Sequence, residues 1–147
     1  MKFLTLNGPH LNFLGIREPD IYGRQTYDDL VAQVRDKARE LGVEVTFYQS
    51  NHEGDLVDAI QRAYTDRTDG IVFNPAAYTH TSVAIADAVK AVGIPTVEVH
   101  ISDVSRREDF RQVSYVRAAA VHTITGQGLA GYGQALEYLV DYLGGRT

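Results

Sequence analysis

Three segments of the chain end a short apolar run in polar side chains that could carry acid–base chemistry. One run ends at Asn7, a second ends at Asn74 shortly before His80, and a third ends in Glu98 and His100. In open α/β sheets, ligands bind in the crevice outside the carboxyl ends of the strands. The pattern therefore predicts one composite polar site built from three strand ends, and it indicates an enzyme.

Glu98 and His100 have the most informative spacing. Residues two apart on a strand point to the same side of the sheet, so the two side chains should project together. A carboxylate beside an imidazole favours the charged ring and can fix its tautomer, which makes His100 a candidate general acid. The alternative is a surface Glu and His at a strand end.

Asn74 and His80 each allow a plainer interpretation. Pro75 excludes helix at Asn74, so the amide could simply cap a turn. His80 could be a residue at the start of the next helix and nothing more.

Residues 10–25 form a loop without helical or strand periodicity, within a single catalytic domain expected to span residues 1–147. A loop this long inside a compact domain is usually functional, often a lid. A cation within reach lowers the pKa of a tyrosine from about 10, so Arg17 or Arg24 beside Tyr22 would yield a phenolate base. The alternative is an ordinary surface loop with its tyrosine packed on the sheet.

Arginines gather after Ser102. Arg107 and Arg111 would share one face of a helix, where a substrate carboxylate or hydroxyl could meet them. Ile101 and Ser102 could offer backbone N–H groups and a hydroxyl to an anion at the start of that helix. A solvated basic face is the alternative.

The composition narrows the function classes. A chain of 147 residues predicts one domain, and a net charge of −5 argues against nucleic acid as the main partner. The absence of cysteine excludes disulfides and thiol chemistry, and no apolar segment suits a signal peptide or a membrane span. We therefore expect a cytoplasmic protein.

Two further patterns carry no functional prediction. Gly126, Gly128 and Gly131 fit G-x-G-x-x-G, but no further strand completes a βαβ unit and no acidic residue lies about twenty positions on. Tight packing between a strand and a helix explains these glycines. The five histidines show no metal-ligand spacing, so no metal is expected.

Apolar runs alternate with helical patterns, which is typical of a parallel sheet covered by helices. Thr26 should cap a helix that Gly42 ends, and a capping box should start another helix at Ser50. The strand near residues 43–47 alternates with polar residues and should lie at the sheet edge. Together these features predict a flavodoxin-like three-layer α/β/α sandwich with a five-stranded parallel sheet. The remaining expected elements are strands near 3–6, 71–73, 94–97 (running into Glu98–His100) and 119–125, and helices near 81–92, 102–111 and 129–143.

Ordered motifs along nearly the whole chain are shared with one enzyme family. The chain resembles type II 3-dehydroquinate dehydratases in the segments 7–15, 17–19, 22–23, 49–51, 74–82, 98–102 and 131–132. The resemblance implies anti elimination of water from 3-dehydroquinate, through an enolate and without a cofactor, to give 3-dehydroshikimate. That step belongs to the shikimate pathway of aromatic amino acid biosynthesis or to quinate catabolism. The resemblance also implies a homododecamer built from trimers.

The resemblance assigns the catalytic roles. Tyr22 would remove the proton next to the ketone, and Arg17 would hold Tyr22 ionised and stabilise the transition state. His100, oriented by Glu98, would protonate the departing hydroxyl.

The resemblance also assigns the substrate-binding roles. Asn74 would hydrogen-bond near the departing hydroxyl, and Ile101 with Ser102 would take the substrate carboxylate. His80 and Arg111 would bind ring hydroxyls. Asp87 would do the same in the site of a neighbouring subunit, and Arg107 would be a supporting cation.

The chain departs from the family pattern at two positions. His10 stands where Asn is usual, at a position that helps hold the enolate oxygen, so it is a possible supporting residue. Arg117 stands where Ser is commoner, which we interpret as a surface or interface variation. Two other functions fit the fold class, a non-catalytic module that binds a small polyhydroxy acid and a flavin-binding flavodoxin.

Overall fold

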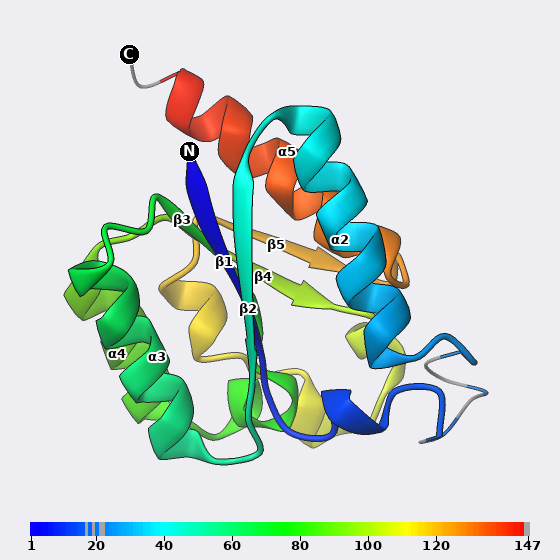
Figure 1. The fold of residues 1–147 in the computed structure, drawn as a ribbon. Coiled ribbons are helices and arrows are strands. Elements are labelled where there is room, and N and C mark those ends of the chain that lie inside the picture. The colour runs from blue at the N-terminus through cyan, green and yellow to red at the C-terminus, as the bar shows by residue number, and fades with distance from the viewer. Residues whose placement is uncertain (17, 19, 21–22, 146–147) are drawn as a thin grey trace.

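Five strands form a single parallel sheet in the computed structural model, which describes residues 1–16, 18, 20 and 23–145 (Figure 1). The strands are β1 (Lys2–Asn7), β2 (Glu44–Gln49), β3 (Gly70–Asn74), β4 (Thr96–His100) and β5 (His122–Thr125). Their order in the sheet is β2-β1-β3-β4-β5, and every neighbouring pair is parallel. This is the flavodoxin-like order, so the predicted fold class is confirmed. The half-exposed strand β2 lies at the edge, as its alternating sequence predicts.

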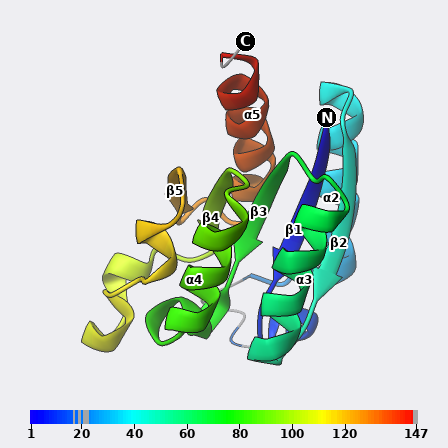
Figure 2. The ribbon, with the colours of Figure 1, turned by 90° about the vertical axis from the view of Figure 1, so that its left-hand side faces the viewer.

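Helices cover both faces of the sheet. The helices α2 (Tyr27–Leu41) and α5 (Ala130–Gly144) lie on one face, and α3 (Glu53–Thr65) and α4 (Val83–Val92) lie on the other (Figure 2). Each pair buries its own apolar cluster against the strands. Side chains such as Leu30 of α2 and Ile60 of α3 are fully buried, and each contributes about 1.5–3 kcal/mol of hydrophobic stabilisation.

The predicted helix boundaries depend on local capping, and one of them is wrong. Thr26 and Asp29 form a capping box at the start of α2, and Gly42 ends that helix in the left-handed conformation. Ser50, in contrast, caps nothing, because α3 begins at Glu53. The Ser50 hydroxyl instead accepts from the backbone N–H of His52 and donates to Asp55.

The predicted helix over residues 102–111 is also wrong. We refer to residues 102–112 as the arginine segment; it contains two short 3-10 helices, Val104–Arg106 and Asp109–Arg111. The Asp103 side chain accepts from the Ser105 backbone N–H, and Arg107 is fully extended. Such local side-chain hydrogen bonds compete with the α-helical ladder.

The end of the chain follows the prediction closely. The strand expected near 119–125 is shorter, His122–Thr125, because the backbone N–H groups of Ala119 and Ala120 donate back to Val116 O in the turn that follows the 3-10 helix Val116–Ala118. Among the described residues, no helix has both the length and the apolar character needed to cross a membrane.

Candidate active site

A pocket opens where β1, β3 and β4 end. About 640 Å3 of empty space lies between its walls and in the open solvent at its mouth. Asn7 and Asn74 are paired across β1 and β3, so the loops that follow these strands start side by side. The structure thus brings together the three polar strand ends that the sequence singled out. The residues lining the pocket include His10, Asn74, His80, His100, Ile101, Ser102, Arg107 and Arg111.

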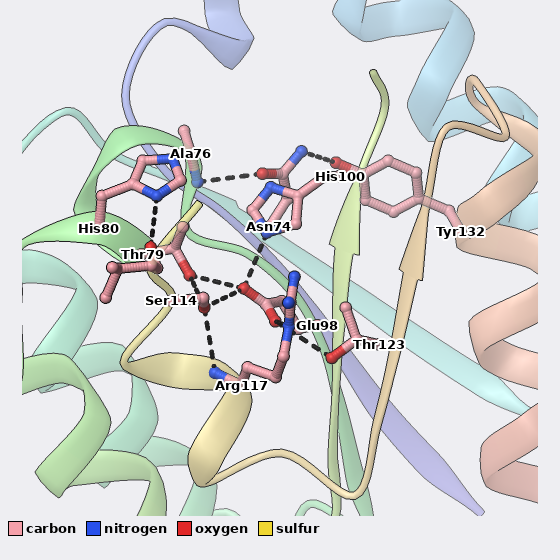
Figure 3. Close-up of polar contacts among 11 residues, drawn as sticks. Asn74, Ala76, Thr79, His80, Glu98, His100, Ser114, Arg117, Thr123 and Tyr132 are labelled. Atoms are coloured by element: carbon pink, nitrogen blue, oxygen red, sulfur yellow. Dashed lines mark hydrogen bonds and ion pairs between the residues drawn. The ribbon is translucent and has the colours of Figure 1, made fainter. Parts of the chain in front are cut away.

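Glu98 and His100 lie on the same side of β4, as their spacing predicts. His100 Nε2 is 2.8 Å from Glu98 Oε2, and both side chains are buried (Figure 3). An ionised carboxylate only accepts hydrogen bonds, so the ring nitrogen facing it carries the proton. This contact leaves Nδ1 of His100 as the ring nitrogen available to a ligand in the pocket.

Four side chains donate hydrogen bonds to the Glu98 carboxylate. Thr79, Ser114 and His100 donate to Oε2 over 2.6, 2.6 and 2.8 Å, and Thr123 donates to Oε1 over 3.1 Å. Burial raises the pKa of Glu98, but the hydrogen bond and charge of His100 and the hydroxyls of Ser114 and Thr79 lower it to about 2. Glu98 is therefore ionised throughout the neutral range, and the tautomer of His100 is fixed by it.

Tyr132 of α5 reaches through the core to the end of β3. Its hydroxyl accepts from Asn74 Nδ2 over 3.0 Å and donates to Asn7 Oδ1 over 2.6 Å (Figure 3). Asn74 Oδ1 accepts from the backbone N–H of Ala76, so both ends of the amide are engaged. Burial raises the pKa of Tyr132, which keeps the hydroxyl protonated. The turn-capping interpretation of Asn74 is therefore correct as far as it goes, and the tyrosine that orients the amide was missed by the sequence analysis.

His80 lies in the 3-10 helix Ala76–His80 and lines the pocket. Its Nδ1 is 2.6 Å from the carbonyl oxygen of Val113, and a carbonyl only accepts, so Nδ1 carries the proton. Burial lowers the pKa of His80, which favours the neutral ring. The neutral ring leaves Nε2 as an acceptor, a group suited to a ligand hydroxyl.

Arg107 and Arg111 line the pocket although the arginine segment is not an α-helix. Arg107 Nη1 donates to Ser102 Oγ over 3.4 Å, and Arg111 Nε donates to Glu108 over 2.7 Å. Two guanidinium groups on one wall make that wall suitable for an anionic or hydroxylated ligand.

Two close backbone approaches hold the pocket walls together. A Cβ atom built on Gly8 would lie 2.5 Å from the carbonyl oxygen of Pro75, and Gly8 N donates to Asn74 O over 2.8 Å. On the other side, Gly126 N donates to the carbonyl oxygens of His100 and Ser102. Glycines of the G-x-G-x-x-G motif thus brace the backbone that follows β4.

Comparison with known proteins identifies the family. The model of the family described as "Dehydroquinase class II" matches residues 1–140. The 3-dehydroquinate dehydratases of Caldicellulosiruptor bescii and Fusobacterium nucleatum are each 52% identical, and each alignment covers 97% of this chain and 98% of the relative. The crystal structure of type II dehydroquinase from Butyrivibrio crossotus superposes with a TM-score of 0.94 at 51% identity, covering 95% of this chain and 97% of that one.

The chain belongs to the class II dehydroquinase family. Of the residues that the family resemblance assigns, Glu98 and Asp87 are described by the structure but do not line the pocket. Arg17 and Tyr22 lie outside the residues that the structure describes. Asp87 lies on the exposed face of α4 and is not among the residues lining the pocket of its own chain.

The two departures from the dehydroquinase pattern have different structural settings. His10 has φ 71°, in the left-handed region, where Asn and His are both enriched among residues other than glycine. Its backbone N–H donates to Asn51 Oδ1 over 3.0 Å, and the residue lines the pocket. Arg117 is only in part a surface variation, because its Nε lies 3.6 Å from Glu98 Oε1.

Among the residues of this chain that the structure describes, no group of three or more His, Cys, Asp or Glu side chains is placed to hold a metal ion. The chemical groups that line the pocket include the His100 imidazole paired with a carboxylate, the His80 imidazole, the oriented amide of Asn74 and the guanidinium groups of Arg107 and Arg111.

Proposed function

We propose that this protein dehydrates 3-dehydroquinate to 3-dehydroshikimate as a cofactor-independent hydro-lyase. Its membership of the dehydroquinase family supports the reaction, and the buried Glu98–His100 pair, whose imidazole lines the pocket, is the observation that supports the catalytic assignment most directly. The same step serves aromatic amino acid biosynthesis through the shikimate pathway and quinate catabolism. A cytoplasmic location is part of this proposal.

The first half of the proposed reaction is removal of a proton. Tyr22, ionised beside Arg17, takes a proton from the carbon next to the ketone, and the C–H electron pair passes into an enolate. Negative charge then develops on the ketone oxygen, which requires hydrogen-bond donors already in position. His10 lines the pocket and is a supporting donor in this proposal.

The second half is loss of water from the opposite face of the ring. The enolate electrons restore the ketone and form the C=C bond, while the C–O bond to the departing hydroxyl breaks. His100 delivers a proton to that oxygen from Nδ1, because Glu98 occupies Nε2. Glu98 stabilises the charged imidazole before the transfer and keeps the ring oriented afterwards.

The remaining groups hold the substrate in this proposal. Asn74 hydrogen-bonds near the departing hydroxyl. The carboxylate is bound by Ile101 and Ser102, with Arg107 nearby as a supporting cation. Ring hydroxyls are bound by His80 and Arg111, and by Asp87 of a neighbouring subunit in a homododecamer built from trimers.

The direct test is to add 3-dehydroquinate to the purified protein and follow the ultraviolet absorbance of the conjugated enone product. The matched variant is Tyr22→Phe, which keeps the ring and removes only the hydroxyl. We expect its turnover to fall about 10²–10⁴-fold while its affinity for a substrate analogue stays within a few fold. Full activity in Tyr22→Phe would remove Tyr22 from the mechanism.

The same preparation separates the other functions. A non-catalytic binding module would bind 3-dehydroquinate without producing the enone, and a flavodoxin would be coloured by its flavin. A light-scattering mass equal to one chain would contradict the dodecamer and the role of Asp87.

A further inference from the structure

Arg117 approaches the buried carboxylate of the catalytic pair from outside the pocket. Its Nε lies 3.6 Å from Glu98 Oε1, whereas His100 contacts the other oxygen, Oε2 (Figure 3). The Glu98 side chain is completely buried, while that of Arg117 is 49% exposed. Arg117 is not among the residues lining the pocket, so it is not placed to contact the substrate.

The position of Arg117 is fixed by the same network that holds Glu98. Its backbone N–H donates to Ser114 Oγ over 3.1 Å, and Ser114 Oγ donates in turn to Glu98 Oε2. The neighbouring residue Val116 is fully buried and anchors the 3-10 helix Val116–Ala118 in the core. The guanidinium group therefore meets the carboxylate from a held backbone rather than from a free loop.

The hydroxyl groups around Glu98 supply hydrogen bonds without charge, whereas the guanidinium group of Arg117 supplies a positive charge. Thr79, Ser114 and Thr123 are neutral, so they replace the hydration of the carboxylate but leave its charge. Arg117 adds a permanent positive charge on the side of Oε1. A carboxylate shared with a cation attracts the His100 proton less strongly than a carboxylate that has only hydroxyl partners.

We propose that Arg117 is a positioning residue that holds Glu98 in place. Through its positive charge it also lowers the affinity of the Glu98–His100 pair for the proton that His100 donates. An acid that releases its proton more readily is a better donor to a departing hydroxyl.

The other charged or titratable groups around the pair face it from the pocket side. Strand β3 contributes none, and His122 of β5 is engaged elsewhere, stacked on Tyr138 with ring centroids 4.3 Å apart. The groups that share the pocket with His100 are His10, His80, Arg107 and Arg111. Each of these is proposed to act on the substrate, whereas Arg117 is a described position at which the charge near the pair can be altered without altering the proposed substrate contacts.

The experiment compares Arg117→Gln, which removes the charge, with Arg117→Lys, which keeps it. Arg39→Gln is the matched control, because Arg39 is an exposed arginine paired with Asp36 on α2, away from the pocket. The first readout is the NMR titration of His100 in the substrate-free protein, assigned with a His100→Gln variant. The second is the dependence of kcat and KM on pH, and thermal unfolding checks that each variant is folded.

Because the guanidinium is half exposed and screened, the expected effect is modest. In Arg117→Gln the His100 midpoint should rise by about half a pH unit at low salt, and the alkaline limb of kcat should move with it. The rise should shrink at about 1 M salt, where the Debye length is about 3 Å. KM should stay within about twofold, Arg117→Lys should restore most of the midpoint, and Arg39→Gln should leave it unchanged.

An unchanged His100 midpoint in Arg117→Gln would overturn the proposal, and so would equal shifts in Arg117→Gln and Arg117→Lys. The kinetic readout rests on the proposed function, whereas the NMR readout does not. A protein without dehydratase activity would therefore refute the proposed function and still leave the NMR titration to decide the role of Arg117.

Discussion

The two walls of the pocket are built in different ways. At the ends of β1, β3 and β4, buried side chains are held by contacts between distant parts of the chain, such as Asn74 with Tyr132, 58 residues apart, and Asn7 with Tyr132, 125 residues apart. The arginine segment is held mainly by neighbours, with Arg111 on Glu108 and Gln112 on the carbonyl oxygen of Val104. The comparison indicates that the proposed proton donor is held by contacts between distant parts of the chain, while the groups proposed to bind the substrate are held by local turns.

Removing His100, the proposed proton donor, should have the largest effect. In His100→Ala, kcat should fall about thousandfold, equivalent to about 4 kcal/mol, because elimination then lacks its general acid. The measurement is steady-state turnover of 3-dehydroquinate, with circular dichroism as the check on folding. A loss of less than about tenfold would mean that another group protonates the departing hydroxyl.

The buried carboxylate should make the fold sensitive to acid. The pKa of Glu98 is lowered from 4.5 to about 2, so its stabilising effect is complete above pH 4.5 and is lost as the pH falls towards 2. That shift corresponds to a free energy of unfolding on the order of 3 kcal/mol. Urea unfolding of the wild type and of Glu98→Gln should therefore differ more at pH 6 than at pH 3. A difference that does not change with pH would contradict this assignment.

Tyr132→Phe tests the long-range part of the rigid wall. The substitution leaves the side-chain amides of Asn7 and Asn74 without their shared hydroxyl, at a cost of about 2 kcal/mol in the free energy of unfolding. We expect kcat to fall several-fold as well, because Asn74 loses one of the two hydrogen bonds that orient it.

Tyr138→Phe is the matched control for that variant. The Tyr138 hydroxyl makes a long 3.5 Å contact with Val121 O and takes no part in the pocket, so its removal should change stability by less than about 1 kcal/mol. Equal losses in the two variants would mean that the Tyr132 hydroxyl has no special role.

The smallest effect is expected on the other wall. Arg111→Gln should raise KM about tenfold, or about 1.4 kcal/mol, with little change in kcat, because a proposed substrate contact is lost and the acid is untouched. Arg106→Gln is the control, since Arg106 is 86% exposed and does not line this pocket. A large fall in kcat with unchanged KM in Arg111→Gln would break the distinction between the two walls.

Short-range rules account for what the sequence predicted correctly. The period of two along β4 places Glu98 and His100 together, and Thr26 with Gly42 bounds α2. The same kind of reasoning failed over residues 102–111, where the Asp103 side chain competes for a backbone N–H that a helix would use. It also failed at Ser50, which bonds to Asp55 instead of capping α3.

Contacts that depend on tertiary packing were beyond such rules. Nothing in the spacing of Tyr132 or Arg117 points to Asn74 or Glu98, because these contacts exist only after α5 and the 3-10 helix Val116–Ala118 have packed on the sheet. The roles of Tyr22, Arg17 and Asp87 remain predictions of the family resemblance.

The crossing of Gly8 over Pro75 bears on how the pocket can be redesigned. Even a methyl group at residue 8 would collide with the main chain of Pro75. The loop that leads to His10 and the end of β3 are therefore packed backbone to backbone and should move together. Substitutions that reshape the pocket at this contact would have to move the ends of both β1 and β3. Engineering of substrate preference should therefore begin from residues 102–112, where the main chain is tethered to its own neighbours and can be rebuilt piece by piece.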